Sequence, residues 1–124
     1  MNDKALPSIS LPDEDAKLVT LARGARGRIG AAEGAAIRDD MGRTYSGASV
    51  VLSSLQLTAM ELAVAQAVAA GAQGIECGVI LGTEVRLGDR DRDHDLGVIR
   101  DLGGAGVPVI MCSAAGSILG RTNT

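Results

Sequence analysis

The sequence predicts an α/β domain of three layers, in which a mixed β-sheet of about five strands is flanked by helices. Apolar residues recur at helical spacing from Leu18 to Ile29, and the short apolar run from Ile75 to Leu81 suits a buried strand. Glycine-containing turn signals separate such segments. In order, the segments read α-β-β-α-β-α-β-β. An opening hairpin followed by strands that alternate with helices implies a mixed sheet.

The chain has the length of one domain, which we expect to span residues 16–121, between a flexible N-terminal tail at 1–15 and a short C-terminal tail at 122–124. The first helix has Pro12 at its front and three acidic residues in its first turn, where carboxylates suit the helix dipole. Three glycines weaken this helix progressively, so we expect it to end near residue 28.

A hairpin is predicted next, from strands at 34–37 and 43–52 that are joined at Asp39-Asp40-Met41-Gly42, where glycine can take a positive φ. A second helix is expected to begin after Ser53-Ser54, either of which can cap it, and Gly71 closes it. This Ala-rich helix has more small apolar positions than one core face can use. Part of its surface is therefore expected to face a partner subunit.

The remainder of the chain alternates again between strands and helices. A buried strand at 75–81 precedes a polar loop at 83–92 and a third helix at 93–102. A fourth strand at 107–112 leads through the turn Ala115-Gly116 to an edge strand at 117–121.

The composition argues against several classes of function. Hydrophobic residues make up 46% of the chain, yet it has one Tyr, no Trp and no Phe, so the core must be aliphatic. Single-stranded nucleic acid is usually held by aromatic rings over a basic groove, and the net charge here is −3, so no nucleic-acid partner is expected. No uncharged apolar run reaches the ~18 residues of a membrane span, and no secretory signal is recognisable. We therefore expect a cytoplasmic protein with no membrane partner.

Several short strings carry a family resemblance through their shared order and spacing. Gly34-Ala35-Ala36 is followed by Gly42-Arg43-Thr44-Tyr45-Ser46-Gly47-Ala48-Ser49-Val50, and later come Ala63 to Gly71, Val98 to Leu102, and Pro108-Val109-Ile110 with Ala115-Gly116-Ser117. Together these strings resemble the cytidine deaminase family, whose opening hairpin typically reads V-G-A-A and then G-x-x-F/Y-x-G-x-N-V-E-N. The resemblance covers about residues 16–121. It implies the deaminase fold, action on a cytidine-like nucleoside and a homo-oligomer, typically a tetramer.

The resemblance also implies a zinc site, which these residues do not supply. The family holds zinc through C/H-A-E at the start of the second helix and P-C-x-x-C at the start of the third, and the Glu moves the proton. Depending on the register, the first ligand falls at Met60, Thr58 or Ala59, and the Cys pair falls at Arg92 and Asp95. None of these is Cys or His, and a guanidinium repels a metal ion. We therefore assign no metal ligand and no cofactor.

The substrate-binding positions depart from the family as well. The family's ribose-binding Asn and Glu fall at Ser49 and Val51, and its Phe before V-G-A-A falls near Ala31. The resemblance thus implies that metal, ribose and ring contacts are lost together.

Two residues remain as candidates for catalysis. Glu61 is a weak candidate for a general acid or base, but without a metal-bound water it has nothing to activate, and a solvated helix carboxylate is the simpler interpretation. His94, the only histidine, is weaker still, because it lies in a charged stretch and no nucleophile elbow accompanies it.

Other chemically reactive side chains have simple structural interpretations. Cys77 and Cys112 fall in predicted strands and are interpreted as buried, unreactive thiols. The acidic residues at 89, 91, 93 and 95 alternate like the front of a calcium loop, but that loop needs Gly at its sixth position and Glu at its twelfth. His94 and Arg100 stand there, so a solvated loop is favoured.

The sequence therefore predicts a deaminase-like protein that has lost zinc-dependent deamination and acts through oligomerisation, as a dimer or tetramer, or through other protein contacts. Two alternatives stay open. One is a divergent hydrolytic deaminase that takes zinc from an unrecognised ligand set, with Glu61, His94, Asp95 and Cys112 as its only plausible parts. The other is a metal-free module that kept a pocket for a nucleoside or another small molecule.

Overall fold

The structure of the protein, a computed structural model, describes residues 11–82 and 90–124. Its elements in chain order are α1 (Asp13–Ile29), β1 (Glu33–Asp39), β2 (Thr44–Ala48), β3 (Val50–Val51), β4 (Gln56–Leu57), α2 (Ala59–Ala69), β5 (Ile75–Gly82), α3 (Arg90–Gly103), β6 (Pro108–Cys112) and β7 (Ile118–Asn123). Five strands form one sheet in the order β2-β1-β5-β6-β7. β5 and β6 run parallel, and the other neighbours run antiparallel. The predicted mixed sheet is confirmed, with β7 at an edge.

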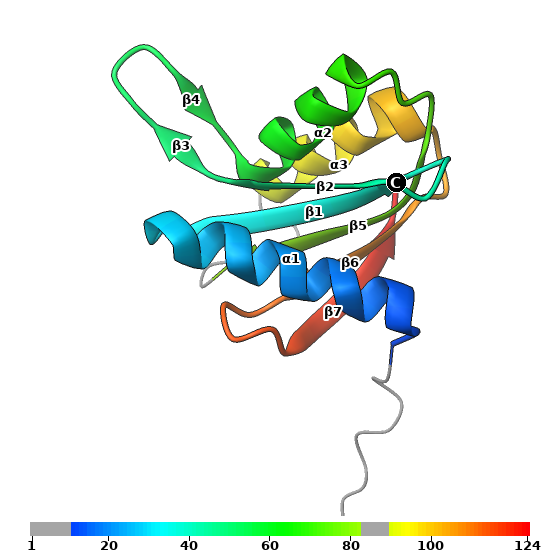
Figure 1. The fold of residues 1–124 in the computed structure, drawn as a ribbon, viewed down its shortest axis with the longest axis horizontal. Coiled ribbons are helices and arrows are strands. Elements are labelled where there is room, and N and C mark those ends of the chain that lie inside the picture. The colour runs from blue at the N-terminus through cyan, green and yellow to red at the C-terminus, as the bar shows by residue number, and fades with distance from the viewer. Residues whose placement is uncertain (1–10, 83–89) are drawn as a thin grey trace, which may run out of the picture.

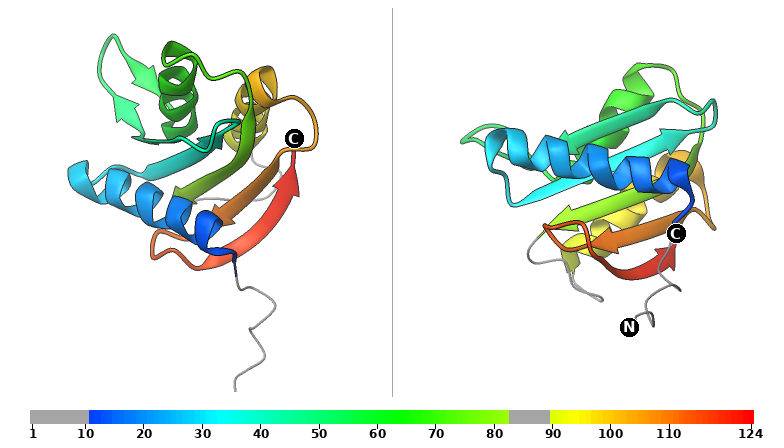
Figure 2. Two further views of the ribbon diagram at one scale, coloured as in Figure 1. Left: turned by 45° about the vertical axis from the view of Figure 1, so that its right-hand side comes forward. Right: turned by 60° about the horizontal axis from the view of Figure 1, so that its bottom comes forward.

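Helices cover both faces of this sheet, with α1 on one side and α2 and α3 on the other (Figures 1 and 2). Successive residues of the interior strand β1 divide between the two faces of the sheet, as strand geometry requires. Ala35 and Ile37 pack in the cluster beneath α2 and α3, whereas Ala36 packs in the cluster beneath α1. β1 is therefore apolar on both sides, and the three-layer architecture is confirmed.

The core is built from aliphatic residues, and it depends on close backbone approach. A Cβ added to Gly47 would lie 2.8 Å from the carbonyl oxygen of Ala59, so the start of α2 rests directly on β2. A Cβ on Gly34 would collide with the carbonyl oxygen of Ala22 in α1. Glycine at these two strand positions lets a helix pack on each face without large side chains between the layers.

The β1–β2 hairpin is held by a buried carboxylate. Asp39, fully buried, accepts hydrogen bonds from the backbone N–H groups of Met41 (2.8 Å) and Arg43 (2.9 Å), from Arg43 Nε (3.0 Å) and from the Tyr45 hydroxyl (2.8 Å). Burial alone would raise the pKa of Asp39, but these hydrogen bonds outweigh it and lower the pKa. The Asp-Asp-Met-Gly turn, with Gly42 at φ 82°, is as predicted.

The second helix begins later than predicted. Ser53 and Ser54 do not cap it; they lie in the loop of a short second hairpin, β3–β4, that precedes the helix. The pairs of this hairpin are Val50↔Leu57 and Val51↔Gln56. The predicted strand at 43–52 is correspondingly shorter, because it ends at Ala48 before the chain turns into this hairpin.

Other boundaries differ by a few residues. The first helix begins at Asp13, so residues 13–15 belong to it and not to the N-terminal tail, and it ends at Ile29 with Gly30 in the left-handed conformation at φ 64°. The third helix begins at Arg90, within the predicted polar loop, of which residues 83–89 lie outside the described part. β7 continues to Asn123, and Thr124 is hydrogen-bonded to Val107, so residues 122–124 do not form a loose tail. Among the described residues, no helix is long and apolar enough to cross a membrane.

Candidate functional site

The start of α2 is held by reciprocal hydrogen bonds between Thr58 and Glu61. Thr58 stands at the N-cap, and its hydroxyl accepts a hydrogen bond from the backbone N–H of Glu61 (3.0 Å). In return, Oε1 of Glu61 accepts one from the backbone N–H of Thr58 (2.7 Å). This is a capping box, which the pattern Thr-x-x-Glu favours because two N–H groups without helical partners are satisfied reciprocally.

The same threonine joins α2 to α3. Its hydroxyl donates to Oδ1 of Asp95 at 2.7 Å, and Asp95 is only 2% exposed. Burial raises the pKa of Asp95 to about 6, although the hydrogen bond from Thr58 acts against the increase. A single hydroxyl therefore caps one helix and binds a buried carboxyl group at the beginning of the next.

Glu61 and His94 also meet across these two helices. Oε2 of Glu61 lies 2.9 Å from Nε2 of His94, whose side chain is 56% exposed. The hydrogen bond with His94, followed by that from the Thr58 N–H, lowers the pKa of Glu61. Both carboxylate oxygens are engaged, and Glu61 is ionised near neutral pH. The sequence singled out both residues but did not predict their contact.

A cavity of about 470 Å³ opens beside this cluster. The sequence-predicted residues Ser49, Val51, Glu61 and His94 all line it. Its other lining residues are Ala32, Glu33, Val50, Gln56, Leu57 and Thr58. The structure thus brings Glu61 and His94 to the same cavity as the two residues, Ser49 and Val51, that stand at the family's ribose-binding positions. An opening of this size with a few convergent polar groups is the usual form of a small-molecule site.

Sequence reasoning missed two polar residues of this cavity, Glu33 and Gln56. The backbone N–H of Glu33 donates to the hydroxyl of Ser49 (3.2 Å), which fixes the wall formed by β1 and the end of β2. No local pattern identifies Glu33, because it lies at the first position of a strand that is otherwise recognised by its buried residues.

The two cysteines do not join the site. Cys77 and Cys112 are buried in neighbouring strands on the α1 side of the sheet, but the register places Cys112 opposite Leu81. Burial raises the pKa of each thiol to about 11. A thiol with such a pKa is a poor nucleophile at neutral pH, so both cysteines act as small apolar side chains.

Two of the alternating acidic residues, Asp93 and Asp95, do not lie in a loop. Asp93 and Asp95 lie in α3, where Asp93 is exposed and Asp95 is buried, while Asp89 lies outside the described residues. The expected solvated loop is therefore wrong for Asp93 and Asp95, which diverge because successive helical residues point in different directions.

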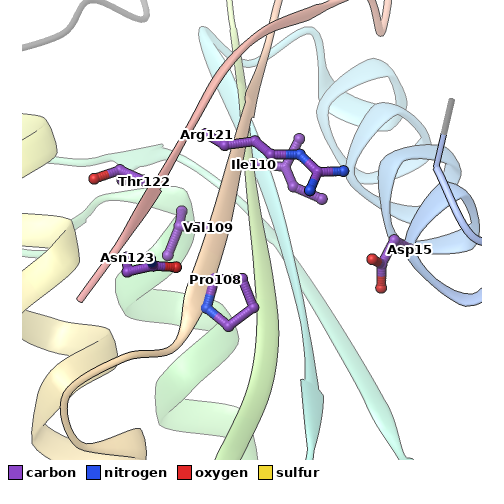
Figure 3. A pocket seen from close by; sticks show the side chains of 7 residues that line it. All are labelled: Asp15, Pro108, Val109, Ile110, Arg121, Thr122 and Asn123. Carbon is purple, nitrogen blue, oxygen red and sulfur yellow. The ribbon is translucent and has the colours of Figure 1, made fainter. Parts of the chain in front are cut away.

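A second, smaller cavity of about 230 Å³ lies elsewhere, lined by Pro108, Val109 and Ile110 of β6, Arg121, Thr122 and Asn123 of β7, and Asp15 of α1 (Figure 3). Its charged residues are Asp15 and Arg121, and none of the sequence-predicted site residues lines it. The larger cavity beside Glu61 is the better candidate.

Comparison with known proteins identifies the architecture. The family described as cytidine deaminase-like matches residues 11–116. The chain belongs to this cytidine deaminase-like family. The fold is shared with the cytidine deaminase from Burkholderia pseudomallei, at 22% identity and a TM-score of 0.70 over 86% of this chain and 89% of that one. It is also shared with the enzyme from Mycobacterium leprae, at 19% identity and a TM-score of 0.66 over 91% and 94% of the two chains. No curated protein sequence matches the chain.

The cytidine deaminase-like fold implies a zinc site, but the side chains at the expected ligand positions of this chain do not suit zinc. Met60 and Ala59 are buried in the core, which leaves Thr58 as the side chain that faces the start of α3. Its counterparts there are the Asp95 carboxyl and Arg92, whose Nη1 lies 3.4 Å from the sulfur of Met111 and whose buried Nε has no hydrogen-bond partner. A hydroxyl, a guanidinium and a buried carboxyl group are not a zinc ligand set. Among the described residues, no group of three or more His, Cys, Asp or Glu side chains is placed to hold a metal ion.

Proposed function

We propose that this chain is a cytidine deaminase-like protein that does not carry out zinc-dependent deamination and acts in the cytoplasm through assembly with other protein chains. The observation that carries the proposal is the 2.7 Å hydrogen bond between Thr58 and the buried Asp95. It occupies the position where the family resemblance places metal ligands, and it consists of side chains that satisfy one another. The space is used to hold two helices together.

The state of Glu61 supports the same proposal. A general acid or base must exchange a proton with a reacting group within hydrogen-bond reach. Here one carboxylate oxygen is bound by the N–H of Thr58 and the other by His94, and the lowered pKa makes Glu61 a poor proton donor near neutral pH. Its contacts serve the start of α2 and join it to His94, so Glu61 is not the solvated helix carboxylate that the sequence favours.

The decisive test measures zinc and activity together. The protein should be purified without a tag from cells supplied with zinc, and its zinc content should be determined by elemental analysis. Cytidine and deoxycytidine deamination are then followed by absorbance, with the Burkholderia cytidine deaminase as positive control. We expect a zinc-to-chain ratio near zero and no turnover. One zinc per chain together with turnover would establish the divergent deaminase instead.

The cavity of about 470 Å³ favours a second candidate, a metal-free binding module for a nucleoside or a similar small molecule. Thermal-shift measurements with nucleosides and nucleotides test it, since a ligand at 100 times its Kd adds about 2.7 kcal/mol to the free energy of unfolding. Val51 lines the cavity and is itself exposed, so Val51→Trp should narrow the opening without disturbing the core. A shift that V51W abolishes would support this candidate.

A further inference from the structure

The cavity of about 230 Å³ between α1 and the edge of the sheet carries opposite charges on two of its walls. Arg121 of β7 lies directly opposite Ile110 of β6, and Ile110 packs in the cluster beneath α1. Side chains directly opposite each other in an antiparallel pair point to the same face of the sheet, so Arg121 lies on the α1 side. Figure 3 shows its guanidinium extended over Ile110 toward α1, with Asp15 on the far side of the cavity.

The negative wall is held in place by an ion pair. The side chain of Asp15 is only 20% exposed, and its Oδ1 accepts a hydrogen bond from Nη1 of Arg38 at 3.0 Å. Arg38 also donates through Nε to Oε1 of Glu76, again at 3.0 Å. One guanidinium is thus shared between two carboxylates, so this group of three side chains carries a net negative charge.

The positive wall has no ion-pair partner. In the part of the chain that the structure describes, Arg121 takes part in no ion pair and its guanidinium makes no hydrogen bond. Both walls nevertheless act on one buried thiol, because burial and then Asp15 raise the pKa of Cys77 whereas Arg121 lowers it. Asp15 and Arg121 therefore lie close to each other, with the cavity between them. The guanidinium presents a planar fork of N–H donors that matches a carboxylate.

The opposite charges restrict the class of molecule that fits between them. A purely anionic ligand would be repelled by Asp15, and a purely cationic ligand would be repelled by Arg121. A small molecule that carries both a carboxylate and an ammonium group satisfies both walls. At about 230 Å³ the cavity is smaller than the ~300–1,000 Å³ of drug-sized ligand sites. The side chains of Pro108 and Ile110 add an apolar surface between the two charges.

We propose that this cavity binds a free α-amino acid with an aliphatic side chain. The carboxylate of the amino acid accepts hydrogen bonds from Arg121, its ammonium group donates to Asp15, and its side chain lies against Pro108 and Ile110. This site shares no lining residue with the cavity beside Glu61. It therefore adds a second binding site to the molecule, and it does not depend on the proposed function.

Leucine and two of its analogues test the proposal. Isocaproate keeps the carboxylate and the aliphatic chain of leucine but lacks the ammonium group, and isoamylamine lacks the carboxylate. Each compound is titrated to millimolar concentration into isotopically labelled protein, and NMR chemical shifts report both the binding site and the Kd. We expect L-leucine to shift resonances of β6, β7 and the start of α1. Each analogue should bind about tenfold more weakly or worse, because it loses one charge-assisted contact.

Two arginine variants separate this site from a general effect of charge. Arg121 and Arg28 are both exposed, and Arg28 lies in the last turn of α1, at the opposite end of that helix from Asp15. We expect Arg121→Gln to raise the Kd for leucine about tenfold or more and Arg28→Gln to leave it unchanged. Circular dichroism checks that both variants are folded.

Three results would overturn the proposal. The first is the absence of chemical-shift changes with leucine at millimolar concentration. The second is an equal Kd in R121Q and R28Q, which would mean that the guanidinium of Arg121 does not hold the ligand. The third is isocaproate binding as tightly as leucine, which would show that Asp15 does not bind an ammonium group.

Discussion

At the scale of single residues, Asp95 is the group whose chemistry differs most from its ordinary behaviour at this site. Its carboxyl group is buried next to Thr58, and the other titratable groups that act on it are Glu33, His94 and Glu61. Two of these three are carboxylates, and both raise its pKa, in addition to the larger effect of burial. Asp95 is therefore held in an environment where ionisation of its carboxyl group is unfavourable.

This environment predicts a pH dependence of stability. The pKa of Asp95 is about 6 in the folded state against an ordinary value of 3.8, so between these two pH values the folded chain binds more protons than the unfolded chain. Its contribution to stability is fully present below pH 3.8 and is lost as pH rises through about 6. The loss relative to Asp95→Asn, which keeps an acceptor for Thr58 but cannot ionise, should reach about 3 kcal/mol.

Urea unfolding of the wild type and D95N between pH 4 and pH 7 measures this difference. Other groups titrate in both proteins, including Asp39 and Glu61, whose lowered pKa values give the opposite pH trend, so their effects cancel in the comparison. We expect the free energy of unfolding of D95N to increase relative to that of the wild type as pH rises. A difference that stays constant over this range would show that Asp95 ionises in the folded state as easily as in the unfolded state.

At the scale of elements, Thr58 connects the starts of α2 and α3. Thr58→Val keeps the shape of the side chain but removes the cap and leaves Asp95 without its donor, which should cost about 2 kcal/mol or more. Thr58→Ser keeps the hydroxyl and should cost less than about 1 kcal/mol, since Ser is as good an N-cap as Thr. Chemical denaturation of both variants measures the costs, and equal effects of the two substitutions would argue against the hydrogen bond as the cause.

The packing of helices on the sheet gives another element-scale prediction. Gly47→Ala would place a Cβ 2.8 Å from the Ala59 carbonyl oxygen, so β2 and α2 would be forced apart. Overpacking of this kind costs about 1–3 kcal/mol. Gly24→Ala is the matched control, because it lies in α1 with nothing within 4 Å of the new Cβ, and it should stabilise the chain by about 0.5–1 kcal/mol. Thermal unfolding should therefore shift in opposite directions for G47A and G24A.

The element order was predictable because it rests on local patterns, whereas the second hairpin was not. Residues 50–57 read Val-Val-Leu-Ser-Ser-Leu-Gln-Leu, with no Gly, Pro, Asn or Asp to mark a turn, so they resemble a strand followed by a capped helix. The true start of α2 does have a local signal, the capping box Thr58-x-x-Glu61. Ser53-Ser54 offered an earlier and equally ordinary cap.

The site was predictable only in part, for a related reason. The resemblance placed Ser49, Val51 and Glu61 in one region, and the cavity contains all three. The contacts of Thr58 with Asp95 and of Glu61 with His94 join residues more than thirty positions apart. They arise where two helices meet across the packed layer, which no periodicity within one segment specifies.

At the scale of the whole molecule, the described chain is held by aliphatic packing on both faces of one sheet. One cluster lies beneath α1 and the other beneath α2 and α3. Direct hydrogen bonds connect the beginnings of α2 and α3, at the place where the resemblance puts a metal. Both described cysteines are free thiols, so no disulfide between them contributes either. Stability should thus come from packing and hydrogen bonds among the residues themselves.

This origin of stability predicts that chelation has no effect. A structural metal binds the folded chain, whereas the unfolded chain has no preformed site for it. Removing such a metal therefore lowers the free energy of unfolding by the free energy of metal binding. Thr58, Arg92 and Asp95 do not form a set of zinc ligands. Incubation with EDTA or a stronger zinc chelator should therefore leave the midpoint of thermal unfolding of this chain unchanged. The Burkholderia cytidine deaminase, treated in parallel, serves as the comparison. The T58V variant adds a second condition, since it should be destabilised equally with and without chelator. A fall in the midpoint of the wild type on chelation would mean that a metal is held by residues outside the positions that the fold assigns to it.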